Sequence, residues 1–566
     1  MTRRPSLRYR LMLSTALLVM LGFAVAIPIA AEAVVVNCNA GQTIKQALSL
    51  SGGGSSGPKQ LVITVSGNCN ENVVINRDDV TINTNGIASA TITAPDAGQA
   101  VITLDGARRI VIDGVVANGI TVVGGTFGLA ATRGSTAILA NCDVSAATNS
   151  AVNSSYSSTL EVDRCVVHNS NRGIVAGNGG QVAVTNSTVR DNTNEGILAV
   201  RVAYVRVGQD RAGNVVARPV TVNNNGTQGI SVFDSSAATI VATTVTNNAG
   251  NGVLFERGSA GTVGTGSNGL VASNTVQNNA LTGTGSGISI YKASSVLVQG
   301  NTINSNGRGI FVGSASSATI IGNTIQSNIG RGVQVAETSS ARIGLVDAAT
   351  TTAANTISGN GSDGIGVFDG GEAVVHGNTI SSNGGNGINM NLSTMNLVGG
   401  NTVSSNTSHG IFVGASRLFQ GPGTFGTLPN LVDVSQNNGL AGLFLFNNSS
   451  ADLYRITLTG NARQGIGASL NSTINLHVYD PARPSNFISI TNNATANVAN
   501  NNDGIALFSA SMLVSPQNPG GPGQVLISGH PSWGVNCFGT TNKAAAALDT
   551  TGISNNALGT VNCGGF

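Results

Sequence analysis

The sequence has very little charge and few aromatic rings. Only 9% of its 566 residues are Asp, Glu, Lys or Arg, only 4% are aromatic, and one is tryptophan. The formal net charge of +2 excludes the broad basic surface that nucleic-acid binding needs, so we expect no DNA or RNA partner. The hydrophobic fraction of 41% still provides a sizeable core, which argues against disorder.

Glycine, in contrast, is abundant. The 76 glycines (76/566) make up about 13% of the chain, against roughly 7% in average proteins. So much glycine in one long chain favours a single repetitive architecture over several ordinary domains.

The first 33 residues have the pattern of an export signal. Four arginines lie within the first ten residues, an apolar run follows over 11–30, and Ala31-Glu32-Ala33 matches an A-x-A cleavage site. We therefore expect an exported protein, in the periplasm, on the cell surface or outside the cell, with no membrane span after signal removal. An uncleaved anchor is the alternative, because the run is about 20 residues long. The paired arginines leave both the general secretory and the twin-arginine routes open.

All six cysteines follow this segment. An even number of cysteines in an exported chain favours disulfides over metal or catalytic thiols. No pair of C-x-x-C motifs at zinc spacing occurs. The expected pairs are Cys38 with Cys69, Cys142 with Cys165, and Cys537 with Cys563.

One pattern recurs through most of the chain. It consists of Asn-Thr-Ile/Val, an Asn three residues after the Ile/Val, and a Gly-Ile/Val followed two residues later by another apolar residue. One copy is Asn301-Thr302-Ile303 with Asn306 and Gly309-Ile310, and most copies are 22 or 23 residues apart. The key glycines are Gly173, Gly196, Gly229, Gly252, Gly287, Gly309, Gly332, Gly364, Gly387, Gly410, Gly442, Gly465 and Gly504.

Each copy predicts short strands separated by turns. Apolar and small polar residues alternate over a few positions and then stop at Asn or Gly. A unit this short cannot bury its own apolar face, so it must stack on its neighbours. We therefore expect an all-β fold, a right-handed parallel β-helix solenoid of about 16 coils. Ile303, Ile310, Val312 and their equivalents should point inward, the Asn306 column should occupy left-handed turns and bond along the axis, and the key glycines should supply positive φ angles.

Four segments are expected along the chain. A signal peptide covers 1–33, an N-terminal cap with a short amphipathic helix in 42–50 covers 34–60, the β-helix covers 61–535, and a C-terminal cap covers 536–566. The caps are expected because a stacked rod leaves two open ends.

The coils resemble the parallel β-helix repeats of the pectin-lyase-like superfamily and of exported bacterial right-handed β-helix proteins. The resemblance covers about residues 61–535. It implies the architecture but no single activity, because the superfamily includes lyases, hydrolases, epimerases, adhesins and proteins of unknown role.

Several steps between key glycines are about ten residues longer than the usual repeat. The extra residues fall within 205–218, 261–272, 342–354, 417–430 and 476–487. Since they enter after the same strand of each coil, they would line one edge of the rod and could wall a groove for a linear polymer. Neutral loop decoration is the alternative.

Residues after the third strand of several coils combine aromatic rings with charged groups. They predict a surface for sugar stacking, with hydroxyl or Ca²⁺ binding by the carboxylates and no other cofactor. Solvated corners over small apolar patches are the alternative. The candidate residues are Phe233, Asp234, Phe255, Glu256, Tyr291, Lys292, Glu337, Phe368 and Asp369.

A further column precedes the key glycines and contains Asp363 and His409. The two residues are two repeats apart, about 10 Å along one face, so they could act as acid and base. His409-Gly410 resembles part of the Gly-His-Gly segment of polygalacturonases, but Ser408 replaces the first Gly, and the accompanying Asn-Thr-Asp and Asp-Asp motifs are missing. Chance placement at a turn is the alternative.

Tyr479-Asp480-Pro481-Ala482-Arg483 resembles the Asp-Pro-His segment of mannuronan epimerases, with Ala482 at the histidine position.

Three functions stay open from the sequence. The first is an exported, non-catalytic β-helix that binds polysaccharide or cell-surface glycan. The second is a polysaccharide lyase or uronate epimerase that acts in a groove along the rod. The third is a passive structural rod. The sequence does not decide whether the protein is an enzyme.

Overall fold

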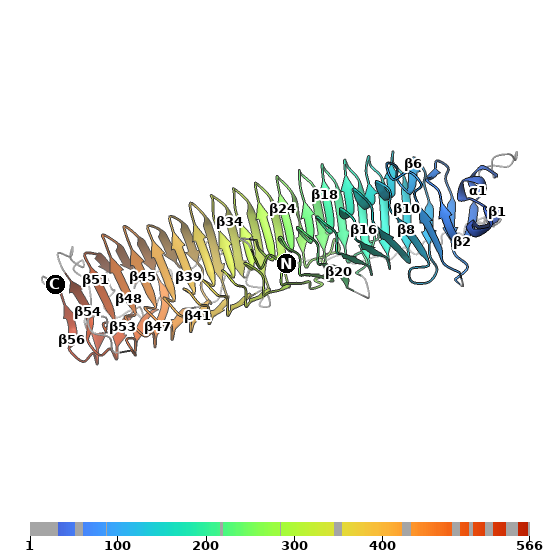
Figure 1. The fold of residues 1–566 in the computed structure, drawn as a ribbon. Coiled ribbons are helices and arrows are strands. Elements are labelled where there is room, and N and C mark those ends of the chain that lie inside the picture. Colours follow the sequence, from blue (N-terminus) through green and yellow to red (C-terminus); the bar gives the residue numbers. More distant parts are fainter. Residues whose placement is uncertain are drawn as a thin grey trace, which may run out of the picture.

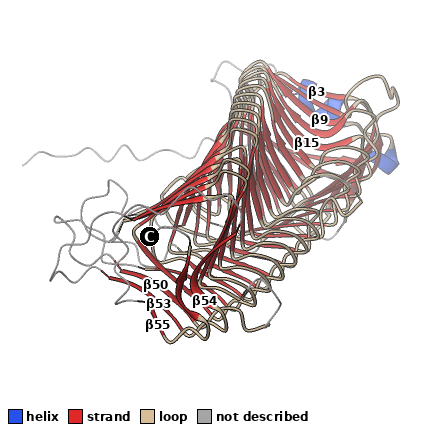
Figure 2. Cartoon of the chain, turned by 90° about the vertical axis from the view of Figure 1, so that its left-hand side faces the viewer, coloured by secondary structure: helices blue, strands red, loops and turns tan. Residues whose placement is uncertain are grey.

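The computed structural model describes residues 32–50, 60–86, 88–215, 219–282, 285–344, 354–421, 432–477, 487–496, 502–514, 524–538 and 553–563. In it the chain winds into one long rod (Figure 1). Seen from the C-terminal end, each turn of the chain contributes strands to three parallel sheets that enclose the core (Figure 2). The expected all-β parallel solenoid is confirmed. Each sheet has nineteen strands among the described residues, so the rod has more coils than the repeat count predicts.

Sheet A forms the first side of each coil. Its strands are β1 (Glu32–Asn37), the first half of β2 (Leu61–Asn70), β4 (Val80–Asn83), β7 (Ile110–Asp113), β10 (Thr136–Ala140), β13 (Thr159–Asp163), β16 (Gln181–Thr185), β19 (Tyr204–Val207), β22 (Ala237–Ile240), β25 (Ala260–Val263), β28 (Ser295–Gln299), β31 (Ser317–Ile321), β34 (Ser340–Gly344), β37 (Glu372–His376), β40 (Thr394–Leu397), β43 (Arg417–Gln420), β46 (Ser450–Leu453), β49 (Thr473–Leu476) and β52 (Ser511–Val514).

Sheet B follows sheet A along the chain. Its strands are the second half of β2, β5 (Ala90–Thr93), β8 (Ile120–Val123), β11 (Cys142–Ser145), β14 (Val166–His168), β17 (Thr188–Arg190), β20 (Val220–Asn223), β23 (Thr243–Thr246), β26 (Thr275–Gln277), β29 (Thr302–Asn304), β32 (Thr324–Gln326), β35 (Thr356–Ser358), β38 (Thr379–Ser381), β41 (Thr402–Ser404), β44 (Asp433–Gln436), β47 (Arg455–Thr459), β50 (Phe487–Thr491), β53 (Gln524–Ser528) and β55 (Ile553–Ser554).

Sheet C completes the coil. Its strands are β3 (Val73–Ile75), β6 (Ile102–Asp105), β9 (Phe127–Thr132), β12 (Ser150–Ser154), β15 (Arg172–Gly177), β18 (Ile197–Val200), β21 (Ile230–Val232), β24 (Val253–Glu256), β27 (Ile288–Tyr291), β30 (Ile310–Val312), β33 (Val333–Val335), β36 (Ile365–Phe368), β39 (Ile388–Asn391), β42 (Ile411–Gly414), β45 (Leu443–Phe446), β48 (Ile466–Ser469), β51 (Ile505–Phe508), β54 (Trp533–Phe538) and β56 (Gly559–Asn562).

The core consists of the inward columns that the repeat predicts. Ile303 of sheet B and Ile310 and Val312 of sheet C are fully buried, and each lies in register with the same position of the next coil. Because every coil repeats this arrangement, apolar side chains form continuous stacks along the rod.

Two ladders of buried asparagine run along the corners of the coil. At the corner between sheets B and C, Asn328 Nδ2 donates to Asn360 Oδ1 at 2.9 Å, as expected for this column. At the corner between sheets A and B, Asn301 Nδ2 donates to Asn323 Oδ1 at 3.0 Å, which makes the Asn of Asn-Thr-Ile a second ladder. The left-handed turn residue is not the ladder asparagine but its predecessor, for example Ser327 with φ 54°.

The key glycines have a different role from the one expected. Gly332 does not have a positive φ. A Cβ on this residue would lie 2.7 Å from the carbonyl oxygen of Gly364 in the next coil and 2.6 Å from Ile357 Cγ2. The glycine is therefore needed for close approach of consecutive coils, and the prediction of positive φ at these positions was wrong.

The N-terminal end is closed by the expected helix. Helix α1 (Ile44–Leu50) buries Ile44 and Ala47 against the first coil. Its first turn is capped by Glu71, whose carboxylate accepts hydrogen bonds from the backbone N–H of Ile44 at 2.7 Å and of Lys45 at 3.0 Å. Residues 1–31 of the expected signal peptide, 1–33, lie outside the described residues. Strand β1 begins at Glu32. In the part of the chain that is described, no helix is long and apolar enough to cross a membrane.

The described part of the expected C-terminal cap, 536–566, contains strands of the β-helix sheets. Strand β54 pairs in parallel with β56, which ends at Asn562. Among the described residues, the sheets of the β-helix therefore continue beyond the boundary expected at 535.

Disulfides close the two ends but not the middle. Cys38–Cys69 and Cys537–Cys563 are bonded as expected. Cys142 and Cys165 are instead free, buried thiols in adjacent coils, so the prediction of a third disulfide was wrong. Each thiol donates to a backbone carbonyl two residues earlier and fills a small apolar position in the core, and burial raises the pKa of the Cys142 thiol.

Candidate functional site

The outer face of sheet C carries the predicted aromatic and charged residues, but in two columns. Strand pairing places Phe233, Glu256, Tyr291 and Phe368 in one column and Asp234, Lys292, Glu337 and Asp369 in the next. Phe255 belongs to neither column: it lies in register with Val232 and Ile290, points inward and is 0% exposed. Gly261 makes room for its ring, since a Cβ there would lie 2.7 Å from Phe255 Cε1. The expectation that Phe255 is exposed was wrong.

Basic neighbours engage the acidic groups of these columns. Lys292 Nζ lies 2.6 Å from Glu256 Oε1, and Arg257 lies 3.4 Å from Asp234 Oδ1. The same cations lie over rings, with Arg257 above Phe233 and Lys292 above Tyr291. Glu337 accepts a hydrogen bond from Ser314 Oγ. This face is therefore a set of local ion pairs beside half-buried rings.

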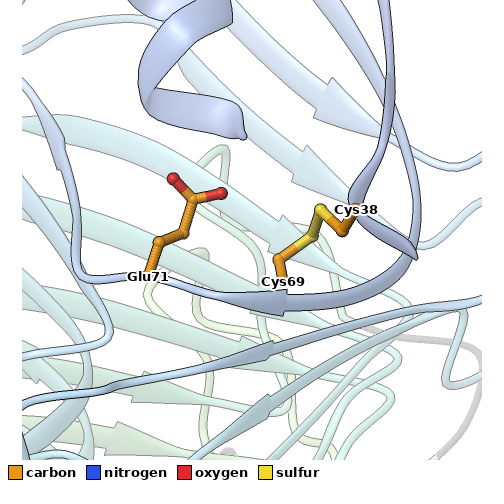
Figure 3. A group of neighbouring side chains, drawn as sticks. All are labelled: Cys38, Cys69 and Glu71. Carbon is orange, nitrogen blue, oxygen red and sulfur yellow. A yellow bond between two sulfur atoms is a disulfide. The ribbon is translucent and has the colours of Figure 1, made fainter. Parts of the chain in front are cut away.

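The carboxylates of this face do not gather into a close group of three metal-ligating residue types among the described residues. Within the described ranges, the only close group of three metal-ligating residue types is Cys38, Cys69 and Glu71. Figure 3 shows that its two sulfurs are bonded to each other and that the Glu71 carboxylate points toward the start of α1. These three residues form a disulfide and a helix cap, and the expected Ca²⁺ binding by the carboxylates of sheet C stays a prediction.

Asp363 lies two residues before β36 of sheet C, and both of its carboxylate oxygens accept hydrogen bonds. It is 4% exposed. One oxygen accepts from Arg331 Nε at 2.9 Å and from Asn389 Nδ2 at 3.0 Å, and the other accepts from the backbone N–H of Asn386 at 2.9 Å and from its Nδ2 at 3.1 Å. This set of donors holds adjacent coils together.

His409 lies in the same column as Asp363, with Asn386 between them. Asn386 Oδ1 accepts a hydrogen bond from the backbone N–H of His409, while His409 Nδ1 accepts one from the backbone N–H of Ala441 at 3.2 Å. The imidazole stacks on Phe444 with ring centroids 4.9 Å apart. Burial, together with the positive charge of Arg463, lowers the pKa of His409 to about 4. The two residues share a face but do not contact each other, so their acid–base role stays a prediction that this geometry does not favour.

The outer face of sheet A carries a groove whose lining residues the sequence analysis did not single out. The groove has a volume of about 510 Å³ and runs across five consecutive strands, β28, β31, β34, β37 and β40. Its floor presents the hydroxyls of Ser295, Ser317 and Ser340 in register, and Arg342 and Glu372 add one charge of each sign. It is open, elongated and parallel to the rod axis.

A polar and aromatic cluster follows the groove on the same face. Asp452 accepts from Asn475 Nδ2 at 2.8 Å, lies 3.2 Å from His477 Nε2 and 3.6 Å from an Arg417 nitrogen. Tyr454 stacks on His477 with ring centroids 4.2 Å apart. Partial burial would raise the pKa of Asp452, but hydrogen bonds from Asn475 and His477 and the charge of Arg417 lower it overall.

This Asp452 cluster carries a sequence signal. Asp452 and Asn475 are 23 residues apart, as are Tyr454 and His477, which is one repeat. Such pairs lie in register on neighbouring strands, as β46 and β49 confirm.

The predicted insertions leave the coil at one common corner, between sheets A and B. Gln209–Val215 and Thr265–Val271 each close with an antiparallel bridge, and Ser267 Oγ donates to Gln209 Oε1 at 3.1 Å, so loops from different coils contact each other. Residues 345–353, 422–431 and 478–486, which include the segment 479–483, lie outside the described residues. The described loops thus leave the rod at one common edge, as the sequence predicts, and this edge borders sheet A.

Comparison with known proteins assigns the family. A model described as "Right handed beta helix region" matches residues 51–212, 100–265, 207–345 and 340–422, which together span 51–422. The chain belongs to the right-handed β-helix family. No curated protein sequence matches it.

Solved structures that resemble this β-helix protein include two epimerases. One is the periplasmic alginate epimerase AlgG, with 11% identity, coverage of 67% of this chain and 77% of that chain, and a TM-score of 0.32. Another is the A-module of the mannuronan C-5 epimerase AlgE4 of Azotobacter vinelandii, with 11% identity, coverage of 84% and 93%, and a TM-score of 0.23. At these scores the likeness carries no information about the substrate or activity of this chain.

Proposed function

We propose that the protein is an exported β-helix that binds a polysaccharide chain along the outer face of sheet A. The observation that carries this proposal is the groove across β28–β40, about 510 Å³ in volume. Five strands spaced about 4.8 Å apart give it a length of about 20 Å, which suits a linear polymer better than a compact metabolite. Regularly spaced hydroxyls with one Arg and one Glu offer hydrogen-bonding partners for sugar hydroxyls and carboxylates.

Export is part of this proposal. The N-terminal sequence pattern and the disulfides at both ends of the rod support it, because disulfides persist outside the cytosol. A glycan of the cell envelope or the exterior would then be within reach.

A second candidate function, polysaccharide lyase or uronate epimerase, is supported by the Asp452 cluster. A carboxylate with a lowered pKa holds an imidazole nitrogen at 3.2 Å beside a stacked tyrosine. A histidine oriented by a carboxylate is a common arrangement for proton transfer. The cluster lies on the face that carries the groove, so a polymer bound there could extend over it.

The test is retention of the mature protein in native gels that contain acidic or neutral polysaccharides, with and without Ca²⁺, together with assays for chain cleavage, unsaturated uronate and uronate epimerisation. We expect retention, and we expect Ser317→Trp to abolish retention that depends on the groove. Gln181→Trp is the matched control, since Gln181 is an exposed residue of sheet A outside the groove. Cleavage or epimerisation that is lost in Asp452→Asn would promote the second candidate. Absence of retention and turnover would favour a structural rod.

A further inference from the structure

We propose that the outer face of sheet C carries a second carbohydrate site, which binds an uncharged glycan by stacking on phenylalanine rings. The site lies on a different side of the rod from the sheet A groove, and its occupancy does not depend on that groove. It would let one rod hold two glycan chains at once.

The site is a groove of about 320 Å³ across four consecutive strands, β36, β39, β42 and β45. Three rings line it, those of Phe368, Phe412 and Phe446. The chain has only 15 phenylalanines in 566 residues, so three in one groove is a strong local enrichment. Phe446 is 41% exposed, and an exposed large apolar group of this kind is typical of a binding surface when it has neighbours of the same type.

Glycines let these rings lie flat on the sheet. A Cβ on Gly414 would lie 3.0 Å from Phe412 Cε1, and one on Gly366 would lie 2.3 Å from Phe368 Cε2. Each ring therefore folds back over the backbone of its own strand. Most side chains of a strand stand perpendicular to the sheet. A ring that lies over its own strand instead exposes its face or its edge to solvent.

The rings form a nearly parallel set. Phe412 and Phe446 have an interplanar angle of 29° and centroids 6.5 Å apart, and Phe412 and Phe444 have an angle of 18° and centroids 6.1 Å apart. The imidazole of His409 extends the set from Phe444 at an angle of 20°. Flat apolar platforms of this kind suit the C–H face of a sugar ring, which is itself flat and apolar.

Amide groups supply the polar contacts beside the rings. Asn389, Asn391 and Asn447 line the groove, and Asn391 and Asn447 are exposed. Each amide offers both donors and acceptors, as sugar hydroxyls do. Asn389 gives one donor to Asp363, which fixes its orientation in the groove.

The groove is uncharged, which decides the class of ligand. None of its lining residues is ionisable. Asp363 is paired with Arg331, whose guanidinium lies over the Phe368 ring, 4.4 Å from its centroid. The rings left open to a sugar are therefore those of Phe412 and Phe446. The lowered pKa of His409 keeps the neighbouring imidazole neutral at physiological pH. A neutral hexose polymer therefore fits this face, whereas the Arg and Glu of sheet A suit a charged one.

The test uses the full mature protein in native gels that contain a neutral β-glucan, dextran or galactomannan, with alginate and polygalacturonate for comparison. We expect at least one neutral glycan to retain the wild type, and we expect Phe412→Ala and Phe446→Ala each to weaken that retention about tenfold. Phe446→Tyr should keep most of it, because the ring face is preserved. Phe508→Ala is the matched control, since Phe508 lies in the same column as Phe446 but outside the groove.

Three outcomes would overturn the proposal. They are no retention by any of the three neutral glycans, equal retention of wild type and Phe446→Ala, and self-association of rods that depends on Phe446. Circular dichroism and thermal unfolding establish that each variant is folded. Ser317→Trp separates the two sites, because it should remove binding at sheet A and leave neutral-glycan retention unchanged.

Discussion

Asn401 and Asp433 are consecutive members of one buried ladder, but only Asn401 is an amide. Asn401 Nδ2 donates to Asp433 Oδ1 at 2.8 Å, and the backbone N–H of Asn401 donates to the same oxygen at 3.0 Å. The second oxygen accepts from Gln420 Nε2 at 2.9 Å. Burial raises the pKa of Asp433 to about 6, against the partial opposing effect of the hydrogen bonds from Gln420 and Asn401. The ladder thus contains one titratable group in an otherwise uncharged column.

This carboxyl predicts a stability that falls as the pH rises. In the unfolded chain its pKa is the ordinary 3.8, so between about pH 4 and about pH 6 the folded protein binds more protons than the unfolded chain. The free energy of unfolding should therefore fall across this window, by up to about 3 kcal/mol from this residue. Urea titrations of the wild type and Asp433→Asn at several pH values measure the effect as their difference. Parallel profiles for the two proteins would contradict it, and Asp369→Asn at an exposed turn is the control.

His409 predicts a pH dependence of the opposite sign. Its pKa is lowered from 6.5 to about 4 by burial and by Arg463, so the unfolded chain binds more protons in that window and the folded state loses stability as the pH falls. His409→Gln keeps an acceptor for the Ala441 N–H and removes the titration. As the pH falls from about 6.5 to about 4, we expect the free energy of unfolding of the variant to rise relative to that of the wild type by up to about 3 kcal/mol. A constant difference between the two proteins over this range would show that His409 is not the source.

The repeat predicts the fold because stacking, rather than distant packing, creates the core. Once Ile303, Ile310 and Val312 recur at one interval, parallel strands in register follow from the need to bury them. The same counting places side chains when it starts from the key glycines. Gly252 and Gly229 are each followed three residues later by an inward position, which assigns Phe255 to the core with Val232. Matching Phe255 to Phe233 by residue type instead led to the wrong face.

Other features depend on contacts that spacing alone does not specify. An even number of cysteines does not distinguish a disulfide from two thiols such as Cys142 and Cys165 that fill small core positions. The sheet A groove is a property of shape across five coils, lined by residues as different as Ser317, Arg342 and Glu372, so it has no motif. The Asp452 cluster is only partly predictable from the sequence. Its one-repeat spacing can be read there, but its hydrogen bonds cannot.

The close approach of coils at Gly332 gives a direct test of what the key glycines do. Gly332→Ala would place a Cβ 2.7 Å from the carbonyl oxygen of Gly364 in the next coil. That oxygen already accepts a hydrogen bond from the backbone N–H of Val333 in the parallel ladder. Since neither backbone can move without breaking that ladder, we expect a loss of about 3 kcal/mol in the free energy of unfolding. Gly177→Ala is the matched control, because its Cβ would meet nothing closer than Val200 Cγ1 at 3.7 Å, and it should change stability by less than about 1 kcal/mol. Equal effects of the two substitutions in urea unfolding would mean that lost glycine flexibility, and not the contact between coils, determines the cost.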